Sequence, residues 1–130
     1  MRLLLVRHAE AAPGHPDELR ALTSQGRRQA RELGKRLARE HPDALLTSPL
    51  LRARETADAI SRAAGLTAEA SDRLGPGAST DDVLLAVAGH GETVVVVGHN
   101  PDCATIAAEL GVGVPQGFPP AGVVAIDVGS

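Results

Sequence analysis

Aromatic side chains are almost absent from this chain of 130 residues: Phe118 is the single one, and there is no tryptophan or tyrosine. The core must therefore consist of Leu, Val, Ile and Ala, and the aromatic platforms that stack single-stranded nucleic acid cannot be built. The formal net charge of −3 gives no general attraction to nucleic acid or to anionic membranes. An anion-binding site would have to come from a local cluster of basic side chains.

Cysteine and long apolar runs are equally scarce. Cys103 is the only cysteine, which excludes an intrachain disulfide framework and a zinc site that needs two cysteines, and it favours a reducing compartment. No apolar run approaches the roughly 18 residues of a membrane span, and residues 1–6 are too short for a signal peptide. We therefore expect a single cytoplasmic domain over residues 1–130, without membrane or nucleic-acid partners.

Strand and helix patterns alternate along the chain. Apolar runs predict strands at 2–7, near 66–70, and at 44–47, 93–98 and 122–128. Helical spacing and capping residues predict helices at 24–40, 50–64, 80–88 and 101–110. Thr23 and Ser48 are expected to cap the first two helices. This alternation predicts a three-layer α/β/α sandwich with a mostly parallel central sheet.

The first predicted helix is strongly basic. It could bind a phosphorylated ligand or an acidic partner, or its charges could form a solvated face with Glu32 and Glu40 as partners, which is the interpretation we favour. The basic residues are Arg27, Arg28, Arg31, Lys35, Arg36 and Arg39.

Basic side chains follow three of the predicted strands at their carboxyl ends, where open α/β sheets place their chemistry. Arg7 and His8 follow the first strand, Arg52 lies in the first turn of the helix after the second, and His99 follows the run 93–97. Two guanidinium groups and two imidazoles around one point suit a tetrahedral dianion. We predict phosphoryl transfer to an unprotonated ring nitrogen of His8, with Arg7, Arg52 and His99 holding the phosphoryl oxygens.

Four segments carry a resemblance to a known family. Arg7-His8-Ala9-Glu10 is similar to an R-H-G-E motif, and Leu22-Thr23-Ser24-Gln25-Gly26 opens a segment like L-T-x-x-G-x-x-Q-A. The segment from Ser48 to Ala57 is similar to S-x-x-x-R-A-x-x-T-A, and Gly98-His99 matches a later G-H turn. In this order the segments resemble the histidine phosphatase superfamily, the phosphoglycerate mutase-like proteins of branch 1.

The resemblance implies a phosphoglycerate mutase-like fold in which His8 is the phosphorylated nucleophile and His99 the second catalytic histidine. It further implies that Arg7 and Arg52 bind phosphate and that no metal or other cofactor takes part. Ala9 stands where the family usually has glycine, a change that the turn should tolerate. The short chain and the lack of the glutamate that mutase-like members use as an acid resemble the SixA-type phosphohistidine phosphatases.

We therefore expect a metal-independent phosphatase that acts through a phosphohistidine intermediate on a phosphohistidine of a partner protein. An imidazole leaves more readily than an alkoxide, so such a substrate demands less of a general acid, for which Glu10 and Asp72 are the candidates. The alternatives are a small-molecule phosphomonoesterase of the same superfamily and a non-catalytic phosphate-binding module. The sequence does not predict the oligomeric state.

Overall fold

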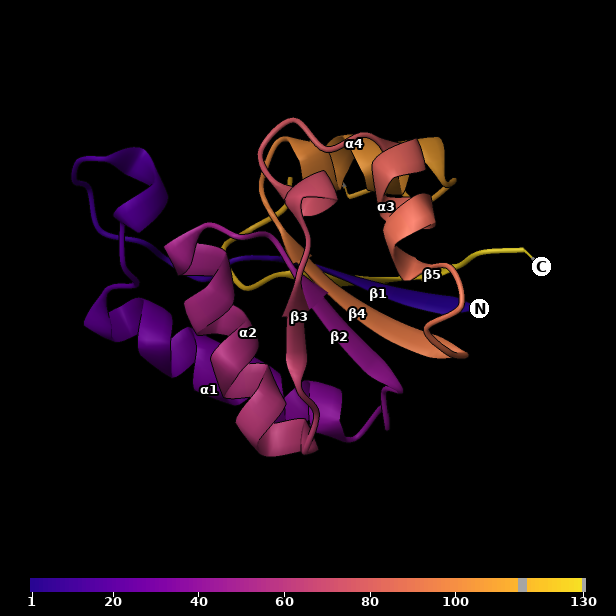
Figure 1. Cartoon of the computed structure of the whole chain (residues 1–130), viewed down its shortest axis with the longest axis horizontal. Coiled ribbons are helices and arrows are strands. Elements are labelled where there is room, and N and C mark those ends of the chain that lie inside the picture. Colours follow the sequence, from indigo (N-terminus) through magenta and orange to yellow (C-terminus); the bar gives the residue numbers. More distant parts are fainter. Residues whose placement is uncertain (115–116, 130) are drawn as a thin grey trace.

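A five-stranded sheet forms the centre of the computed structural model, which describes residues 1–114 and 117–129 (Figure 1). The strand order is β3-β2-β4-β1-β5, and only β5 runs antiparallel to its neighbour. The strands are β1 (Arg2–Arg7), β2 (Ala44–Thr47), β3 (Ala68–Ala70), β4 (Thr93–Gly98) and β5 (Val123–Asp127). The three strands that lead to the predicted site residues, β1, β2 and β4, lie together in the middle of the sheet.

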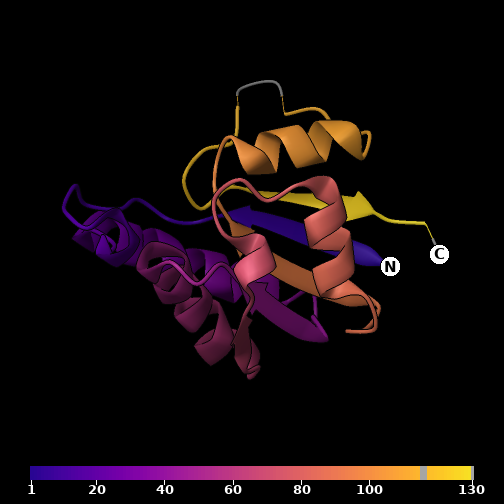
Figure 2. The same ribbon diagram turned by 45° about the horizontal axis from the view of Figure 1, so that its top comes forward.

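Helices cover both faces of this sheet and make it the middle of three layers, as predicted. Figure 2 shows α4 above the sheet and α1 and α2 below it. The helices are α1 (Ser24–Ala38), α2 (Leu51–Ala64), α3 (Thr80–Val87) and α4 (Asp102–Glu109), with short 3-10 helices η1 (Asp17–Leu19) and η2 (Asp72–Leu74). None of the helices in the described part of the chain has the length and hydropathy of a membrane-spanning segment.

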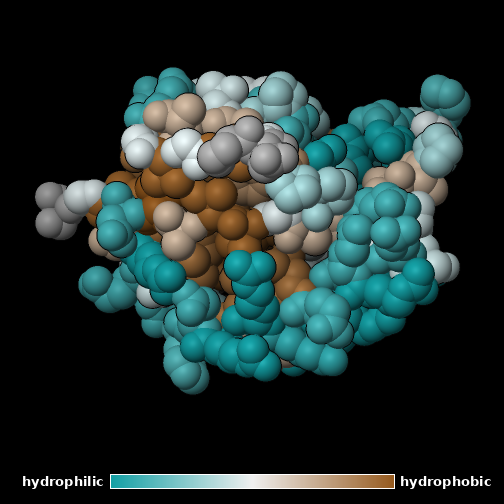
Figure 3. Space-filling model, turned by 180° about the vertical axis from the view of Figure 1, so that it is seen from behind, coloured by the Kyte–Doolittle hydropathy of each residue, from teal (hydrophilic) through white to brown (hydrophobic). Residues whose placement is uncertain are grey.

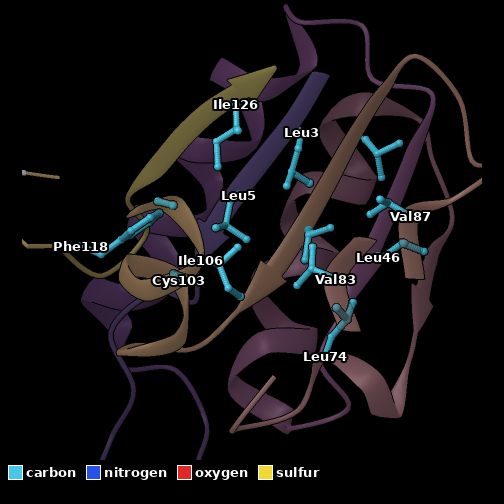
Figure 4. Close-up of a cluster of buried hydrophobic side chains, with 13 residues drawn as sticks. Leu3, Leu5, Leu46, Leu74, Val83, Val87, Cys103, Ile106, Phe118 and Ile126 are labelled. Atoms are coloured by element: carbon cyan, nitrogen blue, oxygen red, sulfur yellow. The ribbon is translucent and has the colours of Figure 1, made fainter. Parts of the chain in front are cut away.

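Alternate residues of each central strand supply the two halves of the core. On β1, Leu3 and Leu5 point toward α3 and α4, and Leu4 and Val6 point toward α1 and α2. The first half includes Phe118, so the single aromatic ring closes one end of this cluster (Figure 4). Each fully buried Val or Leu contributes roughly 1.5–3 kcal/mol, which makes an aromatic-poor core sufficient.

Three details of the sequence prediction are wrong. The basic helix ends at Ala38 rather than at residue 40, and the two 3-10 helices were not predicted. The second helix has Leu50 as its N-cap, and Ser48 does not cap it. Ser48 instead ends the sheet ladder, where its amide donates to the Val97 carbonyl at 3.0 Å, and its hydroxyl accepts from the amide of Leu50, before the helix begins, at 3.2 Å. Thr23 does cap α1, as predicted, by accepting from the Gly26 amide.

The outer surface is uneven in polarity. Seen from behind, hydrophilic side chains cover the α1 side of the molecule, and a hydrophobic area lies beside the edge strand β5 (Figure 3). Val123 and Val124 on this strand are half-buried and Ala125 is exposed. The α1 side, in contrast, presents mainly charged residues to solvent.

Candidate active site

Sheet register brings the two predicted catalytic histidines together. Arg7 pairs with Gly98 at the carboxyl ends of β1 and β4, so the next residues, His8 and His99, leave neighbouring strands at the same level. The His8 amide continues the ladder by donating to the Gly98 carbonyl at 3.0 Å. The two imidazole rings lie with their centroids 5.3 Å apart and tilted by 59°. The prediction that His8 and His99 meet at one site is thus confirmed in geometry.

One hydrogen bond fixes the tautomer of His8. Its Nδ1 lies 2.7 Å from the carbonyl oxygen of Ala9, and because a carbonyl only accepts, Nδ1 carries the proton. Neutral His8 therefore has its lone pair on Nε2. The backbone of Ala9 is held in turn by Thr56, whose hydroxyl accepts from the Ala9 amide at 3.0 Å. Ala9 has no positive φ, so this turn accommodates alanine in place of the expected glycine.

His99 is buried and contacts Ser48, a residue that we had assigned only as a helix cap. Its Nε2 lies 2.7 Å from the Ser48 hydroxyl, and the side chain is 4% exposed. In the described part of the chain, His99 Nδ1 and Arg7 Nε are the buried side-chain polar atoms without a hydrogen-bond partner. Both atoms belong to the predicted site, and such unpaired atoms are otherwise rare in a folded protein.

The two predicted phosphate-binding arginines are held by different segments of the chain. Arg7 ends β1, and one of its Nη atoms donates to the Phe118 carbonyl at 2.8 Å. Arg52, in the first turn of α2 as predicted, is buried although it carries a full charge. A buried guanidinium requires acceptors or an anion to offset its desolvation.

That anion is Asp17, which the sequence analysis did not single out. Arg52 donates to the Asp17 carbonyl at 2.9 Å and to its carboxylate at 3.2 Å. The carboxylate also accepts from Arg20 at 3.0 Å, and this hydrogen bond, helped by Arg52, lowers the pKa of Asp17. Asp17 itself stands in the exposed η1 segment, so its carboxylate stays ionised beside the predicted phosphate site.

The two candidate acids differ in their surroundings. The Glu10 carboxylate accepts from the Thr23 hydroxyl at 2.9 Å, which ties it to the start of α1. The same segment is pressed against α1 at Gly26, where a Cβ would lie 2.0 Å from the Glu10 carbonyl oxygen. Glycine at position 26 is therefore required for the close approach that places Glu10. The other candidate, Asp72, is an exposed residue of η2.

Burial and neighbouring positive charges keep both imidazoles neutral near pH 7. Burial is the main cause that lowers the pKa of His99 to about 4, and the charges of His8 and Arg52 act in the same direction. Burial also lowers the pKa of His8, assisted by Arg52, Arg7 and Arg20 and opposed by the Ala9 hydrogen bond. A neutral His8 with a free Nε2 lone pair among cations can attack a phosphoryl group.

The lone cysteine does not compete for this role. Burial raises the pKa of Cys103 to about 12, so its thiol stays protonated, and a thiol must ionise to act as a nucleophile. Among the described residues, no three His, Cys, Asp or Glu side chains gather as a possible metal-binding group. Of His8 and Cys103, only His8 offers a free lone pair near pH 7, which makes its imidazole the candidate nucleophile.

A sequence profile of the histidine phosphatase superfamily, branch 1, matches residues 3–75. This range includes Arg7 and His8 after β1 and Arg52 after β2. The chain belongs to this superfamily. No relative was found among curated protein sequences. The fold of this histidine phosphatase is the phosphoglycerate mutase-like α/β fold that the sequence predicts.

Solved structures extend the similarity over almost the whole chain. The protein assigned as phosphohistidine phosphatase SixA of Agrobacterium tumefaciens is 30% identical, with 97% of this chain and 90% of that chain covered and a TM-score of 0.79. The protein histidine phosphatase SixA complexed with tungstate is 27% identical over 98% of this chain and 88% of its own, with a TM-score of 0.84.

A mycobacterial glucosyl-3-phosphoglycerate phosphatase shares the fold at 22% identity, with 97% and 90% of the chains covered and a TM-score of 0.73. The superfamily and the two SixA structures support one activity: this protein is a phosphatase, and the non-catalytic binding module is not supported.

Proposed function

We propose that the protein is a metal-independent phosphohistidine phosphatase that acts on a partner protein through a phosphorylated His8. The single observation that carries the proposal is the 2.7 Å hydrogen bond between His8 Nδ1 and the Ala9 carbonyl, beside the second imidazole. It leaves the Nε2 lone pair of His8 as the nucleophile. No side chain has to remove a proton first, because the attacking nitrogen carries none.

In the first step, His8 Nε2 forms a bond to phosphorus while the bond from phosphorus to the leaving nitrogen breaks. The electron pair of that bond goes to the leaving imidazole, which takes a proton from solvent or from the site. In the second step, water attacks the phosphorus and the bond to His8 breaks, which releases inorganic phosphate and restores the neutral imidazole. Charge stabilisation by fixed cations is the main contribution of such sites.

Three side chains would hold the transferred group. Among the described residues, Arg7 Nε and His99 Nδ1 are the buried side-chain atoms that lack partners, and phosphoryl oxygens would accept from both. His99 then carries its proton on Nδ1, and the Ser48 hydroxyl donates to His99 Nε2 across the 2.7 Å contact. Arg52 would add its remaining N–H groups beside those that Asp17 occupies.

A protein substrate is favoured by two observations. The similarity to proteins described as SixA phosphohistidine phosphatases covers 97–98% of the chain. The acid candidates also suit a good leaving group, since Glu10 is engaged by Thr23 and Asp72 is exposed. A phosphohistidine needs less acid catalysis than a phosphate ester.

The test is hydrolysis in the presence of EDTA, with a phosphohistidine protein beside a panel of phosphate monoesters. We expect rapid loss of phosphohistidine, slow monoester turnover, and an acid-labile phosphoenzyme in rapid-quench samples. His8→Ala should lower kcat/KM at least about 1,000-fold. His41→Asn, which changes an exposed histidine with φ 49° at the opposite end of the sheet, is the matched control.

Preference for one small monoester would replace the protein substrate by a metabolite and keep the same site. Full activity of His8→Ala would refute the nucleophile assignment. Loss of all activity in EDTA, restored by one divalent cation, would refute metal independence.

A further inference from the structure

Only one of the two acidic residues that we expected to pair with the basic residues of α1 does so in the described part of the chain. Glu40 pairs with Arg2 instead, and Glu32 contacts only Lys35, at 3.5 Å. Among the described residues, Arg31 on α1 and Arg62 on α2 have no ion pair with a carboxylate. In a chain of net charge −3, this is a local excess of positive charge on one face.

Part of this excess borders a groove of about 500 Å³ between α1 and α2. Four cations stand along it, Arg27, Arg31, Lys35 and Arg62, against two carboxylates. One of these carboxylates, Glu55, is already engaged by the Leu22 amide at 2.8 Å. The rim of the groove is therefore complementary to an acidic surface.

The apolar part of the groove consists of Leu22, Ala30, Ala59 and Ala63. The two helices approach closely at Gly34, where a Cβ would lie 2.8 Å from the Ala59 carbonyl oxygen. Small side chains at such a contact leave a channel that apolar side chains of a partner segment can enter.

The channel has the length of a short helix. Its lining residues run from 27 to 35 on α1 and from 55 to 63 on α2, about 12 Å along each helix axis. An amphipathic helix places apolar side chains at i, i+4 and i+7 over a similar length. An acidic helix with an apolar face matches both the apolar part of the groove and the rim.

One end of the groove lies near the candidate active site. Leu22 and Ala30, which line the groove, form one buried cluster with Ala9, the residue next to His8. On α2, Glu55 stands one turn after Arg52. A segment that lies in the groove therefore has one end about one helical turn from Arg52, a predicted phosphate-binding residue.

We propose that the groove between α1 and α2 docks an acidic helix of the protein whose phosphohistidine enters the site. The proposal rests on the proposed function and names its partner by surface chemistry. Docking through this groove would raise the local concentration of the phosphorylated side chain without adding any contact to the phosphoryl group itself.

Binding is tested with an unphosphorylated, fluorescein-labelled helical peptide of acidic residues and leucines spaced at i, i+4 and i+7. A second peptide has glutamine at each acidic position. The full chain is titrated in 0.15 M salt, and anisotropy reports binding. We expect the acidic peptide to bind at least about tenfold more tightly than the neutral one.

Arg31→Glu with Arg62→Glu should abolish this preference, and the glutamine pair at the same positions should reduce it by an intermediate factor. The control is Arg28→Glu with Arg39→Glu, which makes the same charge change outside the groove and should keep affinity within about twofold because salt screens distant charges. Circular dichroism verifies that each variant is folded.

Four results would overturn the docking surface. These are equal binding of the two peptides, an equal loss in the control pair, competition by single-stranded DNA as effective as by the acidic peptide, and a wild-type dimer that the Arg31 and Arg62 substitutions dissociate.

Turnover separates this proposal from the proposed function. The glutamate substitutions at Arg31 and Arg62 should lower kcat/KM about tenfold for a phosphohistidine linked to the acidic helix and leave free phosphohistidine unchanged. Groove-dependent peptide binding without any phosphohistidine hydrolysis would refute the proposed function alone.

Discussion

Acid should destabilise this fold well above the pH at which carboxylates titrate, because His99 is buried in its neutral form. In the folded protein the pKa of His99 is lowered from 6.5 to about 4, first by burial and then by the charges of His8 and Arg52. The unfolded chain therefore binds the proton more tightly than the folded protein. Stability is fully present above pH 6.5 and declines as the pH falls toward 4.

The magnitude follows from the same values. The gap between 6.5 and about 4 corresponds to about 3 kcal/mol when the transition is complete, of which about 2 kcal/mol is lost by pH 5. His8, whose pKa is lowered as well, acts in the same direction below pH 6.5. Stability of a domain is typically only about 5–15 kcal/mol, so this change is large enough to measure.

Urea unfolding followed by far-UV circular dichroism at pH 8, 6.5, 5.5 and 5 measures the effect, since the chain has no tryptophan for fluorescence. Replacing His99 by glutamine should flatten the profile. NMR titration of the histidine resonances should give His99 a pKa well below 6.5. A free energy of unfolding that stays constant between pH 8 and pH 5, or an unchanged slope in the glutamine variant, would refute the reasoning.

Two further predictions concern the surroundings of the site. Gly26→Ala should lower the free energy of unfolding by about 1–3 kcal/mol, with a loss of activity, because its Cβ would meet the Glu10 carbonyl oxygen at 2.0 Å. The control is Gly75→Ala, where the nearest atom lies at 3.5 Å and φ is −66°. Equal melting temperatures of the two variants would contradict this prediction. Asp17→Asn should strengthen competitive inhibition by inorganic phosphate about fivefold, because the anion that now pairs with Arg52 is removed. Weaker inhibition would show instead that Asp17 mainly orients the Arg52 guanidinium.

The sequence predicts the middle of the sheet well and the edges of the site poorly. The strands Ala44–Thr47 and Thr93–Gly98 have the predicted bounds, because continuous apolar runs are typical of buried parallel strands. The positions of the site residues follow from the strand bounds. His8 follows β1, His99 follows β4, and Arg52 lies in the first turn of the helix after β2. Their roles in catalysis stay predictions that the hydrolysis experiments test.

Contacts between distant segments were missed for a physical reason. Asp17 meets Arg52 across 35 positions of the chain through a 3-10 helix of three residues, too short to have a periodic signal. Ser48 was assigned to the helix that follows, although it directly follows β2 as His99 follows β4. That parallel was the available signal for the contact between Ser48 and His99.

The equal level at which β1 and β4 end has a consequence for how this site tolerates change. The two histidines are successors of paired residues, so the spacing of two hydrogen-bonded strands, about 4.8 Å, sets the separation of their backbones. Residues 10–23 and the segments around Phe118 surround this centre without determining its spacing. Their length and charge can therefore vary without changing the separation of the His8 and His99 backbones, which stays a property of the sheet.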